Sequence, residues 1–305
     1  MSYAEHFTLA LALVAFRELR TPSRITQVLC DHGQEALVQL FDELDDTDRE
    51  SILEEASALT EKAIRVTMFT DPDYPKSLIR KGRPIAPILF YWGNSDLFHA
   101  PSVGMCGSRS ATQLGLKAAH ACGEEVTRHN MVVVSGYAKG VDTTTHLAAL
   151  TAGGKTVVVL AEGFNHFRIK RVFSGTFDAR RVLVISQFQP SQRWTAYAAM
   201  ARNGVIYGLS RALVVVEAGE KGGTLAAGQG AMRAGRPVLV LNFGESTPEG
   251  NRILVAAGGQ SIRSRDELGE AIIGNFSVKN DAEQGELPIF GGSVSGPSES
   301  RGDHL

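Results

Sequence analysis

The stretch Val132-Val133-Val134-Ser135-Gly136-Tyr137-Ala138-Lys139-Gly140-Val141-Asp142 decides the fold. Its valines are typical of a strand buried on both faces, because β-branched side chains suit the centre of a sheet. Ser135-Gly136 predicts a turn, and a helix is expected to begin near Asp142, a residue type common at helix N-caps. A strand that leads through a glycine turn into a helix directs free backbone N–H groups at an anion. Lys139 adds a positive charge there, so the stretch predicts an anion site.

The same pattern occurs upstream, in Val103-Gly104-Met105-Cys106-Gly107-Ser108-Arg109. A short apolar strand again leads into a glycine turn, and Arg109 lies just before an expected helix. Crossover helices place such turns on one edge of a parallel sheet, where ligands bind. Either turn alone could serve only to connect a strand to a helix, but two basic turns on one edge predict a phosphate pocket. Neither turn carries the G-x-G-x-x-G or G-x-x-x-x-G-K-[ST] motif of familiar nucleotide sites.

The composition is that of an ordinary globular protein. The chain has 305 residues, 43% hydrophobic residues and a formal net charge of −2, so nucleic-acid binding would require a local basic patch. The cysteines lack metal-ligand spacing, which fits a reducing cytoplasm. The apolar segment between Phe7 and Phe16 is too short to span a bilayer. We therefore expect a cytoplasmic protein without a membrane segment, a metal or a cofactor.

Charge is unevenly distributed along the chain. Acidic residues crowd the region 42–55, and basic residues recur from Arg168 to Arg193. Residues 1–62 show apolar positions at helical spacing and predict a small all-helical N-terminal module. The acidic run favours a docking role for this module over contact with a DNA backbone. Residues 63–100 are expected to be a connector that packs on the core, in which Ile88 to Trp92 could pair as an edge strand.

Strand and helix patterns alternate in residues 101–275. Continuous apolar strands separated by helices predict an α/β fold with a Rossmann-like, doubly wound, mainly parallel sheet. Residues 276–305 are poor in large apolar side chains and predict a disordered tail, in which the island Leu287 to Phe290 could be a docking peptide. The expected strands are 103–106, 131–135, 156–160, 182–186, 213–217 and 238–241, and the expected helices lie near 112–129, 142–152, 194–208, 224–234 and 266–273.

Many blocks of the sequence resemble the DNA processing protein A family (DprA, also called Smf), in both order and spacing. The resemblance covers about residues 67–265. It implies single-stranded DNA binding in a basic pocket, homodimerisation and loading of a RecA-type recombinase, without catalysis. The blocks are Asp71 to Leu78, Gly107 to Thr112, Ser135 to Asp142, His146, Ala149-Leu150, Gly154 to Thr156, Gly208 to Ser210, Val216 to Ala218, Gly223 to Leu225 and Gly235-Arg236.

The resemblance also implies which residues bind the strand. Arginine and lysine would neutralise phosphates, and an asparagine could orient a base edge. It carries over Ser108, Arg109, Ser135, Gly136, Lys139, Arg202 and Asn203, and to these we add Gly107, Gly140, Arg168, Lys170, Lys221 and Thr224 as expected phosphate contacts.

The chain departs from the family pattern at several positions. Family members commonly have Arg-Asn-Arg where this chain has Arg202-Asn203-Gly204, so we expect one positive charge to be missing from the pocket. Phe167-Arg168 replaces the usual Tyr-Pro. Lys170 and Arg171 follow, and these residues could restore charge from another direction.

Two other functions stay open on sequence alone. A similar pocket could sense a small nucleotide-derived ligand, as suggested for relatives in bacterial defence systems. A nucleotide N-glycosidase would need a glutamate three residues after Gly222-Gly223-Thr224, and this chain has Ala227 at that position. Glu217, Glu162 and Asp142 are the nearby acids, and His146 is expected to be a hydrogen-bonded core residue. We therefore expect a binding protein and not an enzyme.

Overall fold

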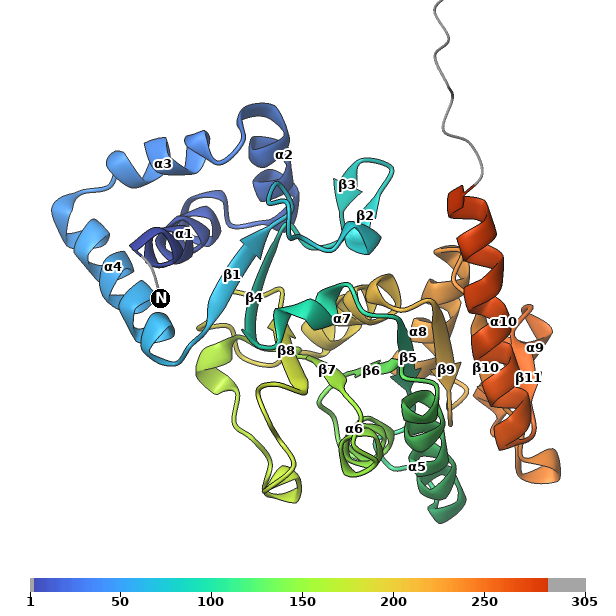
Figure 1. Cartoon of the computed structure of the whole chain (residues 1–305). Coiled ribbons are helices and arrows are strands. Elements are labelled where there is room, and N and C mark those ends of the chain that lie inside the picture. The colour runs from blue at the N-terminus through green and yellow to red at the C-terminus, as the bar shows by residue number, and fades with distance from the viewer. Residues whose placement is uncertain (1–2, 285–305) are drawn as a thin grey trace, which may run out of the picture.

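A nine-stranded sheet forms the centre of the protein (Figure 1). The computed structural model describes the backbone of residues 3–284 and the side chains of residues 5–274. The strands lie in the order β1-β4-β8-β7-β6-β5-β9-β10-β11. The seven neighbouring strands β8, β7, β6, β5, β9, β10 and β11 pair in parallel. In contrast, β4 is antiparallel to both β8 and β1. This confirms the predicted α/β class and mainly parallel sheet.

The elements follow the predicted alternation. The strands are β1 (Arg65–Met68), β4 (Ile88–Gly93), β5 (Ser102–Cys106), β6 (Val132–Ser135), β7 (Thr156–Val159), β8 (Val182–Ser186), β9 (Ala212–Val215), β10 (Val238–Leu241) and β11 (Gln260–Ile262), with β2 (Ile79–Arg80) and β3 (Arg83–Pro84) in a separate hairpin. The helices are α1 (Tyr3–Val14), α2 (Pro22–His32), α3 (Glu35–Asp42), α4 (Asp46–Glu61), α5 (Gln113–Arg128), α6 (Val141–Thr151), α7 (Ala196–Leu209), α8 (Gly223–Arg233), α9 (Glu249–Ala256) and α10 (Arg265–Gln284).

Helices cover both faces of the parallel part of the sheet. Side chains of α5, α6 and α10 pack against one face, where Val133 and Val214 are fully buried. Side chains of α7, α8 and α9 pack against the other face, where Val134 and Val215 are fully buried. Neighbouring residues of one strand thus point into opposite layers, which explains the continuous apolar strand sequences. Within residues 3–284, no helix is long and apolar enough to cross a membrane.

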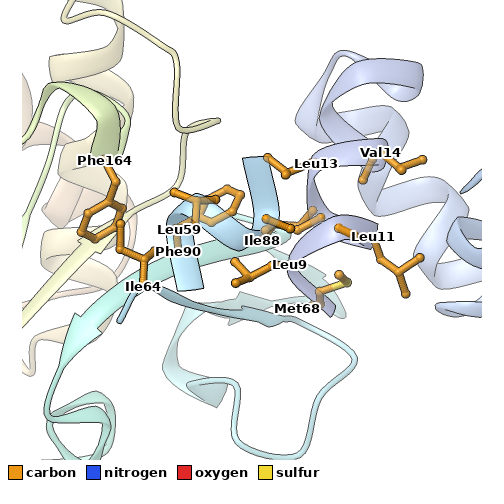
Figure 2. Close-up of a cluster of buried hydrophobic side chains, with 14 of the residues drawn as sticks. Leu9, Leu11, Leu13, Val14, Leu59, Ile64, Met68, Ile88, Phe90 and Phe164 are labelled. Atoms are coloured by element: carbon orange, nitrogen blue, oxygen red, sulfur yellow. The ribbon is translucent and has the colours of Figure 1, made fainter. Parts of the chain in front are cut away.

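The helical N-terminal module shares a hydrophobic core with the sheet. Figure 2 shows Leu9 and Leu13 of α1 packed near Met68 of β1 and Ile88 and Phe90 of β4. The same cluster extends to buried residues of β7 and β8. The prediction of an edge strand at residues 88–92 is wrong, because β4 lies between β1 and β8 and is paired on both sides.

Two elements were not predicted, and a third is longer than predicted. The predictions omitted α9 and β11, and Gln260-Ser261-Ile262 has only one large apolar residue by which to recognise a strand. Helix α10 continues to Gln284, so residues 276–284 are helical and not the start of a disordered tail. The rest of the predicted tail, with its island from Leu287 to Phe290, lies outside the described residues.

Candidate functional site

The candidate site lies where the strand order of the sheet reverses. From β5 the chain runs through β6 and β7 to β8, and then returns to β9 on the other side of β5. A crevice opens outside the carboxyl ends of the strands at such a point. Residues 107–110 after β5, and Gly219 and Lys221 after β9, line a cavity of about 460 Å³ there. The start of α8 and the adjacent part of α7 complete its wall.

The two basic glycine turns of the sequence are in direct contact. A Cβ atom at Gly140 would lie 2.4 Å from the carbonyl oxygen of Ser108, and Gly140 has a φ of +74°. A Cβ atom at Gly107 would lie 2.4 Å from Val141 Cγ2. The Val141 amide donates to the Ser108 carbonyl at 3.3 Å. Glycine is therefore required at both positions, because any side chain would separate the turns.

Arg202 is the buried cation of the site. It projects from α7, is 6% exposed and lines the cavity. Its guanidinium covers Gly136, where a Cβ atom would lie 1.5 Å from Nη1. Within the described residues, its Nε and Nη1 groups have no hydrogen-bond partner. A buried donor without an acceptor is costly, so this side chain is suited to receive an anionic oxygen.

Asp142 lies beside Arg202 and balances part of its charge. The Asp142 Oδ2 and Arg202 Nη1 atoms are 3.8 Å apart. Burial lowers the pKa of Arg202, the Asp142 carboxylate opposes this effect, and the nearby Arg109 adds to it. The prediction that Asp142 caps α6 is wrong, because the N-cap is Gly140 and Asp142 lies inside the first turn. Its carboxylate accepts the Ala138 amide at 3.3 Å instead.

A second cavity of about 250 Å³ adjoins the first. Lys139 and Glu162 line it, and it shares Arg109, Trp194 and Arg202 with the larger cavity. Together the two cavities are lined by four cationic side chains and two carboxylates, which leaves an excess of positive charge. These are Arg109, Lys139, Arg202 and Lys221 against Asp142 and Glu162.

Helix termini add to this field. The N-caps of α6 and α8 are Gly140 and Gly222, and no side chain caps either helix. Free amide groups and the helix dipole at such ends favour an anion. The predicted residues that line the larger cavity are Gly107, Ser108, Arg109, Arg202, Asn203, Lys221 and Thr224. Among the other predicted residues, Lys139 lines the smaller cavity, whereas Gly136 and Gly140 shape the turn behind them.

Three predicted phosphate contacts have other roles. The Ser135 side chain is fully buried and donates to the Met105 carbonyl at 2.8 Å, so it joins β5 to β6. Lys170 Nζ donates to the Tyr137 carbonyl at 2.7 Å, the Ala138 carbonyl at 3.2 Å and the Thr143 hydroxyl at 3.0 Å. Its three protons are thus already used. Arg168 donates to two carbonyls of its own loop and lines neither cavity.

Gly204 does not face the cavity. A Cβ atom at this position would lie 3.1 Å from Ile85 Cγ2, beside the β2–β3 hairpin. Arg202 and Ile206, four residues apart on α7, both line the cavity, and Gly204 lies between them on another side of the helix. A side chain at this position would therefore leave α7 beside the hairpin, and the expected loss of positive charge from the pocket stays a prediction.

Sequence reasoning missed Trp194. Its side chain is 47% exposed, lines both cavities and lies under the Arg109 guanidinium, 5.0 Å from the ring centroid. Glycine and charge patterns do not mark an aromatic residue in a loop. The signal available was an indole among polar residues, directly before the N-cap Thr195 of α7.

Glu217 and His146 are held by hydrogen bonds inside the protein. Glu217 accepts the amide and the hydroxyl of Thr112, so it orients the turn before α5. His146 is fully buried, with ring nitrogens 2.6 Å from the Thr156 hydroxyl and the Gly136 carbonyl. Burial lowers the pKa of His146 to about 4. Ala227 lines the cavity where a glycosidase of the related type would carry its acid.

These features define an α/β protein of the Rossmann type with a positively charged cavity at the switch point of its sheet. The chain belongs to the family described as DNA recombination-mediator protein A, whose model matches residues 65–272. The family predicted from the sequence blocks is therefore confirmed.

Known relatives agree with this assignment. DNA processing protein DprA of Streptococcus pneumoniae is 34% identical over 190 residues, which are 60% of this chain and 66% of that protein. DprA of Bacillus subtilis is 29% identical over 71% of this chain and 74% of that protein. The X-ray structure of the S. pneumoniae protein superposes with a TM-score of 0.63 at 27% identity and covers 87% of this chain and 91% of that chain.

A second solved structure shares the fold. DNA processing protein A of Helicobacter pylori, described for its single-stranded DNA binding mode, superposes with a TM-score of 0.60 at 21% identity. The match covers 69% of this chain and 96% of that chain. The Rossmann-like core is therefore common to all three proteins.

Proposed function

We propose that this protein binds single-stranded DNA at the paired cavities and acts as a recombination mediator. The observation that carries the proposal is the buried Arg202 guanidinium, which has donors without acceptors and is joined by Arg109, Lys139 and Lys221. A cluster of this kind suits a chain of phosphates better than a single carboxylate. The single-stranded DNA binding described for the H. pylori relative supports the same ligand.

The proposal includes delivery of a RecA-type recombinase onto the bound strand by a homodimer. Both parts are carried over from the family resemblance, and the family's description as recombination mediators supports the first. We propose binding without catalysis, because Ala227 offers no carboxylate at the start of α8 and Glu217 is held by Thr112.

Fluorescence anisotropy of a labelled oligo-dT tests strand binding. We expect Arg109→Ala and Lys139→Ala to weaken binding at least tenfold each, because each removes a charged contact to phosphate. With about four phosphates neutralised, the log–log salt slope for a single strand should be about −3. Arg168→Ala is the matched control, since this exposed arginine lines neither cavity. Equal loss in all three variants would contradict a localised site.

A sensor of a nucleotide-derived ligand is the second candidate. The larger cavity, at about 460 Å³, has the volume of a small-molecule site. Competition separates the two functions within the same assay. Affinity that rises with oligonucleotide length supports the strand, whereas full displacement of the oligo-dT by a mononucleotide at equal concentration supports the sensor. A duplex competitor should displace the strand poorly, because its bases are stacked and paired.

A further inference from the structure

The Arg109–Trp194 pair stands between the two cavities. Both residues line the larger and the smaller cavity, and the guanidinium carbon of Arg109 lies over the indole at 5.0 Å from its centroid. Each cavity has a lysine that the other lacks, Lys221 in the larger and Lys139 in the smaller. The pair therefore contributes to the wall of both cavities, with Lys221 in one cavity and Lys139 in the other.

The backbone beside the indole is fixed, although the indole itself is exposed. Trp194 directly precedes Thr195, whose hydroxyl accepts the Ala198 amide at 3.0 Å and so fixes the start of α7. Nevertheless, 47% of the Trp194 side chain is open to solvent, and the neighbouring Met200, which lines the larger cavity, is 45% exposed. An exposed aromatic face beside cationic side chains is the arrangement on which single-stranded bases stack.

We propose that Trp194 is a stacking platform for one nucleobase of the bound strand. Arg109 covers one face of the ring, and the base stacks on the other. The phosphates on either side of that nucleotide then lie in the two cavities, near Lys221 and Lys139. This inference rests on the proposed function, because it assigns a position to one base of the strand that the function requires.

Oligonucleotides with and without bases test the platform. The probes are a labelled oligo-dT and an abasic sugar–phosphate strand of equal length. We expect Trp194→Ala to weaken oligo-dT binding about 5- to 150-fold, the range for loss of one base–aromatic stack. Its effect on the abasic strand should be several-fold smaller, since no base is present to lose its partner. Trp194→Phe should recover most of the affinity.

Tyr197→Ala provides the matched control. Tyr197 lies in the first turn of α7, three residues after Trp194, and is 83% exposed but lines neither cavity, so its removal should change oligo-dT affinity less than twofold. A loss equal to that of Trp194→Ala would overturn the platform, because exposure alone would then explain the effect.

Intrinsic fluorescence gives a second measurement. The chain has two tryptophans. Trp92 stacks on Phe177 with 5.9 Å between the ring centroids, and it lines neither cavity. In a Trp92→Phe variant, Trp194 is the sole tryptophan, and its emission should be quenched by oligo-dT and much less by the abasic strand. Quenching of equal size by both strands would overturn the inference.

The outcomes separate this inference from the proposed function. If wild type binds both strands and Trp194→Ala weakens both equally or neither, the platform is wrong and the phosphate site stands. If wild type binds neither strand, both the proposed function and the platform are wrong. Preferential loss of the base-bearing strand in Trp194→Ala supports both.

Discussion

The junction between the N-terminal module and the sheet contrasts with the cavity at the carboxyl edge of the strands. The junction is filled by fully buried apolar side chains such as Leu9, Ile88 and Phe90. At the edge, Arg202 is almost as well buried but keeps two nitrogen groups without partners among the described residues. The first region contributes stability through packing, whereas the second accepts an electrostatic cost at a place suited to ligand binding.

The largest expected effect is at the junction. Phe90 is fully buried at the centre of β4 and stacks with Phe16 at 6.0 Å between ring centroids. Phe90→Ala should lower the free energy of unfolding by about 3–5 kcal/mol, because it leaves a cavity in a packed core. Chemical denaturation measures this loss. If the two regions are independent, the folded variant should keep its strand affinity within about twofold, and a loss of binding would show that they are coupled.

The next effect concerns His146, which links the two regions. Its ring lies against Phe173 of the junction core at 6.4 Å and contacts the Gly136 carbonyl behind the cavity. Its folded-state pKa of about 4 lies below the usual 6.5, so the unfolded chain binds more protons between these values. Stability should therefore fall as the pH drops from about 6.5 to 4. The loss should reach about 3 kcal/mol at 1.36 kcal/mol per pH unit.

The control for this pH effect is His146→Gln, whose side-chain amide can donate and accept hydrogen bonds but does not titrate. Denaturation midpoints of both proteins, measured from pH 4 to 7, isolate the histidine from the carboxylates that titrate in the same range. Parallel pH profiles for the two proteins would show that His146 is not the group responsible.

A smaller effect is expected at Lys170. All three of its ammonium protons are used in hydrogen bonds, whereas Arg202 has nitrogen groups without a partner among the described residues. Lys170→Met removes three hydrogen bonds to residues 137–143 and should lower the free energy of unfolding by about 1–3 kcal/mol. We also expect the 137–138 turn to loosen, which hydrogen exchange of its amides would detect. Lys139→Met, an exposed neighbour, should leave stability within about 0.5 kcal/mol. Equal destabilisation by both variants would contradict the distinction.

The smallest effect is expected at Gly204. Gly204→Ala adds a methyl group beside Ile85 and away from the cavity, so strand affinity should change less than twofold. Anisotropy measures this directly, with Asn203→Ala as the comparison, since Asn203 lines the cavity on the adjacent helix position. A clear change in affinity for Gly204→Ala, larger than that for Asn203→Ala, would mean that the α7 face is assigned wrongly.

The parallel strands and the family could be predicted from the sequence, because apolar runs such as Val132 to Val134 and glycine turns such as Gly107 are local signals. The roles of Ser135 and Lys170 could not, since they depend on partners such as the Met105 and Tyr137 carbonyls that only folding brings near. Trp194 was missed for the same reason, because its significance comes from Arg109, which is distant in sequence.

The position of β4 between β1 and β8 determines when this strand can be paired on both sides during translation. Phe90 pairs with Ser186, 96 residues later, whereas β1 and β4 pair within a segment that also contacts α1. At about 5–20 residues per second, the ribosome needs roughly 5–20 s to add the missing strand. During that interval the edge of β4 that later pairs with β8 has no partner. Chaperone capture during translation should therefore concentrate on this edge, and should end once β8 has emerged.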